Sequence, residues 1–62
     1  MPTYIKALLK CLRQDYVEAQ RDGQFMVAAN RQYAISACHV YADLSEEQKA
    51  DLAERAEAYG LK

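Results

Sequence analysis

The residues best suited to chemistry in this sequence are two cysteines and one histidine, Cys11, Cys38 and His39. Adjacent residues on a helix point about 100° apart, so Cys38 and His39 are poorly placed to chelate one ion. Structural zinc also needs four ligands, usually with a Cys-x-x-Cys spacing. We therefore predict no metal site and interpret both cysteines as small apolar groups. A redox role for Cys11 and Cys38 is the alternative.

Catalysis has little support in the same residues. Catalytic Cys–His pairs are neighbours in space rather than in sequence, and no glycine-rich turn accompanies this pair to form an oxyanion hole. The acidic pair Glu46-Glu47 is explained by the start of a helix. With 62 residues, the chain is too short for a dinucleotide-binding fold or a barrel. We predict a non-enzymatic protein without a cofactor.

A row of basic residues is the second group that could bind a ligand. Lys6, Lys10 and Arg13 fall on one face of a predicted helix, and Arg31 lies in the next one. These four are candidate phosphate contacts, so the alternative function is a small DNA-binding transcriptional regulator. The net charge of −1 gives no positive excess, and we do not expect nucleic acid as the main partner.

The charge is also unevenly distributed. Residues 1–40 sum to +2 and residues 41–62 to −3. Such asymmetry favours antiparallel self-association or an oriented partner.

The elements that must position these groups are helices. Alanine, leucine, glutamate, glutamine, lysine and arginine dominate, and the chain has only two glycines and one proline. No segment alternates between apolar and polar residues with period two, so no strand is expected. We predict a single all-α domain over residues 1–62, with helices over about 3–22, 24–43 and 46–59.

Local signals mark the ends of these helices. Thr3 is a candidate N-cap, and Gly23 is a candidate C′ residue that would fold the first two helices into an αα-hairpin. Ser45 and Gln48 have the spacing of a capping box. Gly60 predicts a Schellman ending for the third helix.

The spacing of apolar residues predicts which helix faces are buried. The predicted core is Ile5, Leu8, Leu12, Tyr16, Met26, Tyr33, Val40, Leu44, Leu52 and Tyr59. A second apolar line in the middle helix consists of Phe25, Ala28, Ile35 and Ala42. So wide an apolar arc predicts more than one packing neighbour. We expect a homodimer to complete the bundle, because one copy offers few sizeable apolar residues.

Aromatic residues and methionine away from the main stripes are the candidate interface. They are Tyr4, Phe25, Met26 and Tyr41. No apolar run approaches the ~20 residues of a membrane span, and the N-terminus lacks the pattern of a secretory signal. With two cysteines that do not form a disulfide scaffold, we expect a cytoplasmic protein that does not associate with membranes.

Taken whole, the chain resembles the small helical proteins of the early (exo–xis) region of lambdoid phages. The resemblance is carried by Tyr4-Ile5-Lys6, Leu8-Leu9-Lys10, Tyr33-Ala34-Ile35 and Cys38. It implies a phage or prophage developmental regulator that acts by contact with a host or phage protein, in the host cytoplasm. It brings no catalytic residues with it.

Overall fold

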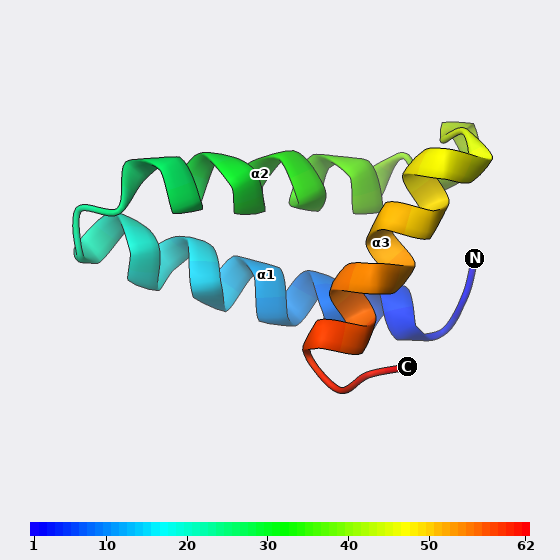
Figure 1. Cartoon of the computed structure of the whole chain (residues 1–62), viewed down its shortest axis with the longest axis horizontal. Coiled ribbons are helices and arrows are strands. Elements are labelled where there is room, and N and C mark those ends of the chain that lie inside the picture. Colours follow the sequence, from blue (N-terminus) through cyan, green and yellow to red (C-terminus); the bar gives the residue numbers. More distant parts are fainter.

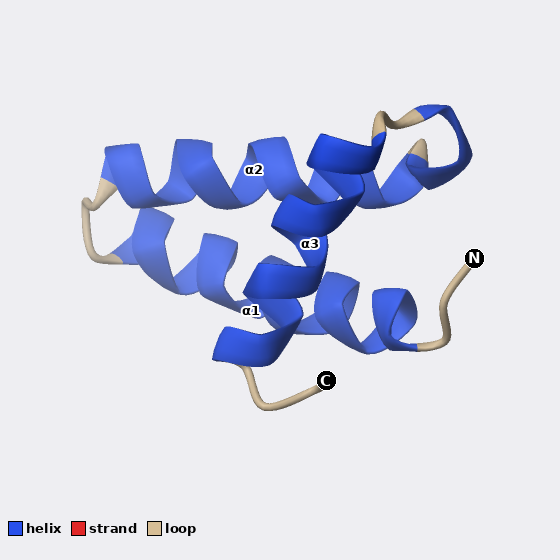
Figure 2. Ribbon diagram, turned by 45° about the vertical axis from the view of Figure 1, so that its right-hand side comes forward, coloured by secondary structure: helices blue, strands red, loops and turns tan.

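The computed structural model describes residues 1–62 and contains only helices (Figure 1). They are α1 (Tyr4–Arg21), α2 (Phe25–His39), the short 3-10 helix η1 (Tyr41–Asp43) and α3 (Glu46–Ala58). The all-α prediction is confirmed. α1 and α2 run antiparallel as a hairpin, and α3 crosses them near the end that holds the N-terminus (Figures 1 and 2). The tip of the hairpin extends beyond α3.

The hairpin turn is closed by Gly23, whose φ is 75°. Its amide donates to the Gln20 carbonyl at 3.1 Å. The next amide, of Gln24, donates to the Ala19 carbonyl at 2.8 Å. These two bonds define a Schellman ending, and its left-handed residue is usually glycine. The predicted end of the first helix is therefore confirmed.

Both ends of α3 also form as predicted. The Gln48 amide donates to the Ser45 hydroxyl at 3.2 Å, and the Ser45 amide donates to the Gln48 side chain at 2.9 Å. This is a complete capping box. At the other end Gly60 has φ 75°, and the Leu61 amide donates to the Ala56 carbonyl at 2.9 Å. These local bonds fix the length of α3 independently of the hairpin.

The start of α1 differs from the prediction in one respect. Thr3 is the N-cap residue, but its side chain makes no capping hydrogen bond. Its backbone is already helical, with φ −64° and ψ −30°. The first turn is closed instead by the Ile5 amide, which donates to the Pro2 carbonyl at 3.2 Å.

The second helix was predicted to reach residue 43, and this is wrong. α2 ends at His39, the Val40 amide bonds back to the Ala37 carbonyl at 3.2 Å, and η1 follows. A bond to the third preceding residue tightens the chain into a 3-10 turn. The turn lays Tyr41 and Leu44 against the core as half-buried side chains. It also reverses the chain so that α3 can cross the hairpin.

The core contains few large side chains. The largest fully buried residues are Ile5, Leu8 and Leu12 of α1 and Leu52 of α3. The other buried residues are small: Ala19, Ala28, Ala34, Ala37, Cys38 and Ala56. α2 thus contributes only alanine and cysteine to the buried core. Small residues at a contact allow two helices to approach closely, so α2 packs its backbone near α1.

The prediction of which face of α2 is buried is wrong. Met26 is 88% exposed, Tyr33 57% and Val40 49%. At 100° per residue, Ala28 lies 200° from Met26, so the buried and exposed faces of α2 are on opposite sides. The predicted core residues Tyr16, Leu44 and Tyr59 are half-buried, while Ile5, Leu8, Leu12 and Leu52 are buried as expected.

The close packing of α2 can be tested at Ala34, because the side chain of this residue is fully buried. Ala34→Leu should lower the free energy of unfolding by ~1–3 kcal/mol, because the added atoms overpack the core. Urea denaturation followed by circular dichroism measures the change. Ala50→Leu, at an exposed position of α3, is the matched control and should change stability by less than ~0.5 kcal/mol. Equal losses for the two variants would contradict the packing.

Candidate functional site

The outward surface of α2 is unusual because it carries no formal charge at neutral pH. Its exposed residues, with His39 counted as neutral, are Phe25, Met26, Val27, Ala29, Asn30, Gln32, Tyr33, Ser36 and His39. The one charged residue of α2, Arg31, is half-buried and lies beside Asp15. Depletion of charge together with aromatic residues and methionine is typical of the centre of a protein interface.

Three of the large apolar side chains on this surface lie at equal intervals. Met26, Tyr33 and Val40 are seven residues apart, and all three are exposed. Seven residues are close to two helical turns, so these side chains share one face. We call Met26 and Tyr33 of α2, together with Val40 directly after its end, the α2 stripe. The sequence pattern had shown this stripe but assigned it to the core.

The surfaces of the other two helices differ sharply from α2. The exposed charges of α1 are Lys6, Lys10, Arg13, Glu18 and Arg21. Those of α3 are the acidic Glu46, Glu47, Glu54 and Glu57. Charged faces of this kind are solvated and rarely form the centre of an interface. Apart from Met1 and Val17, the exposed large apolar side chains therefore belong to α2 and the adjoining Val40.

The four residues predicted as an interface do not lie together. Phe25 and Met26 are exposed at the start of α2, with 70% and 88% of their surface accessible. Tyr4 and Tyr41 pack against the core and are half-buried. Burial raises the pKa of the Tyr4 phenol, and the neighbouring Tyr41 raises it further. Lys49 Nζ lies 5.3 Å from the centre of the Tyr41 ring, so that ring is partly covered from outside.

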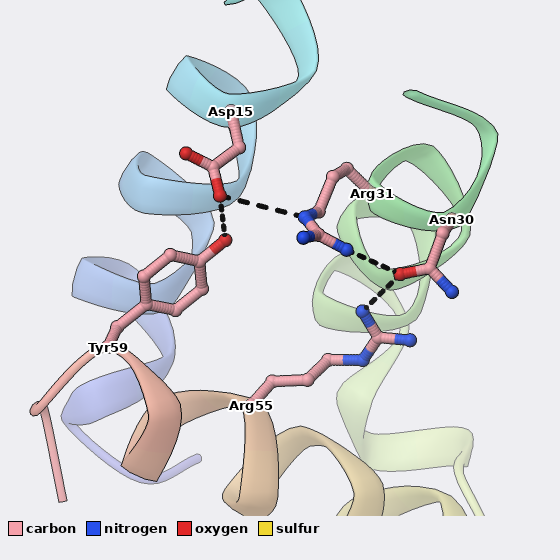
Figure 3. A network of polar contacts seen from close by, with 5 residues as sticks. All are labelled: Asp15, Asn30, Arg31, Arg55 and Tyr59. Atoms are coloured by element: carbon pink, nitrogen blue, oxygen red, sulfur yellow. Dashed lines mark hydrogen bonds and ion pairs between the residues drawn. The ribbon is translucent and has the colours of Figure 1, made fainter. Parts of the chain in front are cut away.

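The predicted phosphate contacts are divided between two places. Lys6, Lys10 and Arg13 are exposed on α1 at the spacing of one helix face. Arg13 also donates to His39 Nε2 at 3.4 Å across the hairpin. Arg31 is turned instead into a polar network with α1 and α3 (Figure 3). Three of the four predicted phosphate contacts therefore lie together on α1, and Arg31 is separate from them.

The two cysteines are free thiols in different surroundings. Cys38 is buried in the core, and its burial raises the pKa of the thiol. A raised pKa lowers the fraction of reactive thiolate. Cys11 is half-buried on α1 and is the more accessible of the two. No group of three or more metal-ligating side chains is arranged to hold an ion, and a redox role for either cysteine stays a prediction.

A polar network that the sequence did not predict joins all three helices (Figure 3). Arg31 Nη1 and Arg55 Nη1 both donate to Asn30 Oδ1, at 2.7 and 2.9 Å. Arg31 Nε lies 3.6 Å from Asp15 Oδ2, and the Tyr59 hydroxyl donates to the same carboxylate oxygen. The partners are up to 44 residues apart in sequence, so no local pattern could indicate them.

The network is balanced in charge and fixes the position of α3. Arg55 Nε lies 3.0 Å from Asp51 Oδ2, so each guanidinium has a carboxylate neighbour. A groove of about 650 Å³ lies beside Arg55 between α2 and α3, and Tyr33 forms part of its wall. With both arginines already paired, this region is better suited to orient α3 than to capture an anion.

Tyr59 provides the test of this network. Burial, followed by the hydrogen bond to Asp15, raises the pKa of Tyr59 from 10.0 to about 12. Between pH 10 and pH 12 the unfolded chain loses this proton while the folded chain keeps it. The protonated Tyr59 therefore contributes its full share to the free energy of unfolding below pH 10, and this contribution is lost as the pH rises through 12.

We expect Tyr59→Phe to flatten the fall in unfolding free energy over that pH interval. Urea denaturation at a series of alkaline pH values gives the slopes. Tyr33→Phe, which alters an exposed phenol, is the control and should retain the slope of the unmodified chain. The same slope in both variants would refute the role of the Tyr59–Asp15 bond.

Comparison with known proteins found no matching family model, no similar curated protein and no similar solved structure. None of the helices combines the length and apolar character required to cross a membrane. The resemblance to early-region phage proteins stays a prediction.

Proposed function

We propose that this chain is a small non-enzymatic regulator that acts by contact with other proteins, and that its working form is a homodimer. The observation that carries the proposal is the uncharged surface of α2 with its exposed stripe of Met26, Tyr33 and Val40. Large apolar side chains gathered on one face of a small domain are typical of an association surface.

The small size of the buried core supports the same proposal. Only 10 of the 62 residues are buried, and six of these are alanine or cysteine. A domain of this size buries a smaller fraction of its surface than a larger domain does, and it is marginally stable by itself. Covering the α2 stripe with a second protein surface would add apolar burial that a single copy lacks. Association and stability are thus expected to rise together.

The resemblance to early-region phage proteins supports a regulatory role, in which the host or phage partner would be met in the host cytoplasm. The uneven charge of the chain supports an oriented encounter, because α1 presents basic residues and α3 acidic ones. No part of this proposal requires a cofactor.

Sedimentation equilibrium over micromolar to millimolar concentrations tests the proposal. We expect a species of twice the 7.1 kDa chain mass. Tyr33→Lys should weaken association at least tenfold, because it buries a charge on the stripe. Gln14→Lys, which adds the same charge to an exposed position of α1, should leave association unchanged. A 7.1 kDa species at every concentration would refute the homodimer.

The alternative is a small DNA-binding regulator, and one observation favours it. Lys6, Lys10 and Arg13 are exposed together on α1, and none of them forms an ion pair. Binding of duplex DNA should then fall steeply with salt, with about three ions released. Fluorescence anisotropy from 20 mM salt upward measures this slope, and no binding at the lowest salt would exclude the alternative.

A further inference from the structure

We infer that the groove between α2 and α3 binds an arginine side chain of a partner protein, with Tyr33 against the guanidinium plane and Glu47 as the counter-ion. This is the groove that lies beside Arg55. The inference rests on the proposed function, and it names the chemistry by which a host or phage partner would be recognised.

The groove has an aromatic ring on one wall and carboxylates on the other. Tyr33 of α2 is the one hydrophobic residue of its lining, and 57% of the surface of this residue is accessible. Glu47 and Asp51 line the groove from α3, where they lie one helical turn apart on the same face. The volume of about 650 Å³ is in the range of sites that hold small ligands, so a long side chain has room to enter.

The carboxylates of the groove have oxygen atoms without a partner in the protein. The Glu47 side chain forms neither an ion pair nor a hydrogen bond. Asp51 accepts from Arg55 Nε at 3.0 Å through Oδ2, and its other oxygen accepts no hydrogen bond. Glu46, the preceding residue, is different because it pairs with Lys49 at 3.9 Å. The groove therefore offers acceptors that an outside donor can use.

The charge balance of the groove favours a cation. Glu47 and Asp51 contribute two negative charges and Arg55 contributes one positive charge, so the lining has a net charge of −1. Arg55 is held by Asp51 and by the Asn30 side chain, which leaves Glu47 as the unpaired charge. The other exposed charges of α3 are also acidic, so the potential around the groove attracts a basic group.

A guanidinium group fits this lining better than an ammonium group. It is planar, so it can stack against Tyr33 while the N–H groups in its plane donate to carboxylate oxygens. A lysine ammonium could pair with Glu47, but it has no plane to lay against the ring. Arginine and tyrosine are also among the residues that contribute most to binding energy at protein interfaces. We therefore expect the groove to distinguish arginine from lysine.

The arginine is expected from a different protein rather than from a second copy. The outward surface of α2 is uncharged, so a homodimer formed through that surface supplies no arginine to the groove. Most of the lining comes from Ser45 and α3, and only Asn30 and Tyr33 belong to α2. Tyr33 thus borders both the self-association surface and the site for the partner.

NMR titration with three short peptides tests the groove. The probes are acetyl-Gly-Arg-Gly-amide, its lysine counterpart and its citrulline counterpart, which has the shape of arginine without the charge. The arginine peptide should shift the Tyr33 ring signals and bind about threefold more tightly than the lysine peptide, because only a guanidinium stacks on the ring. The citrulline peptide should cause no saturable shift. Equal affinity for the arginine peptide and either of the others would overturn the inference.

Variants of exposed residues locate the site. Glu47→Gln should weaken binding of the arginine peptide about threefold, because it removes the unpaired charge and keeps the shape of the side chain. Tyr33→Leu should weaken it by about the same factor, because it removes the aromatic face. Glu46→Gln is the matched control, since it alters a neighbouring acid outside the groove and should retain the affinity of the unmodified chain.

Circular dichroism confirms that each variant folds. Equal losses in Glu47→Gln and Glu46→Gln would indicate only a general attraction to the acidic helix and would overturn the inference.

Sedimentation equilibrium separates this inference from the proposed function. Glu47→Gln should self-associate like the unmodified chain, and a loss of self-association would assign the groove to a second copy and overturn the inference. A homodimer that does not bind the arginine peptide would refute the groove site and leave the proposed function standing. Binding of the arginine peptide by a chain that stays monomeric would support the groove site and remove the homodimer.

Discussion

The structure depends on close contact between helices across small side chains. α2 contributes only alanines and Cys38 to the buried core and lies close to α1, while the large buried side chains come from the other two helices. Where backbones approach this closely, a large residue has no space. The larger apolar residues of α2 must therefore lie elsewhere, and most of them line its outer surface. The architecture of the core thus determines the chemistry of the exterior.

The features that the sequence predicted correctly are those encoded by neighbouring residues. The capping box of Ser45 and Gln48 needs only residues of the first turn, and the glycine endings at Gly23 and Gly60 need only a few amides and carbonyls. The apolar stripe of α1 was also assigned to the correct face, since that helix has one apolar side and one charged side. Neighbouring residues were sufficient to predict these helix ends and the buried face of α1.

The face of α2 could not be predicted in the same way. Apolar residues occur around most of this helix, and periodicity alone gave preference to the larger ones, Met26, Tyr33 and Val40. Which side is buried depends on the space left by α1 and α3, which is a property of the assembled fold. The network around Asp15 was missed for a similar reason. Its partners come from all three helices, and neither Asn30 nor Asp15 looks unusual within its own segment.

The short length of α2 has a consequence for how the protein would respond in a cell. The stripe consists of only three large side chains, and the last of them, Val40, directly follows the end of α2 at His39. A contact of that size supplies modest binding energy, so the balance between single and paired chains shifts within an ordinary range of concentration. In the proposed dimer, the amount of protein made would itself set the fraction assembled. A longer interface would bind more tightly, so the paired fraction would depend less on expression level.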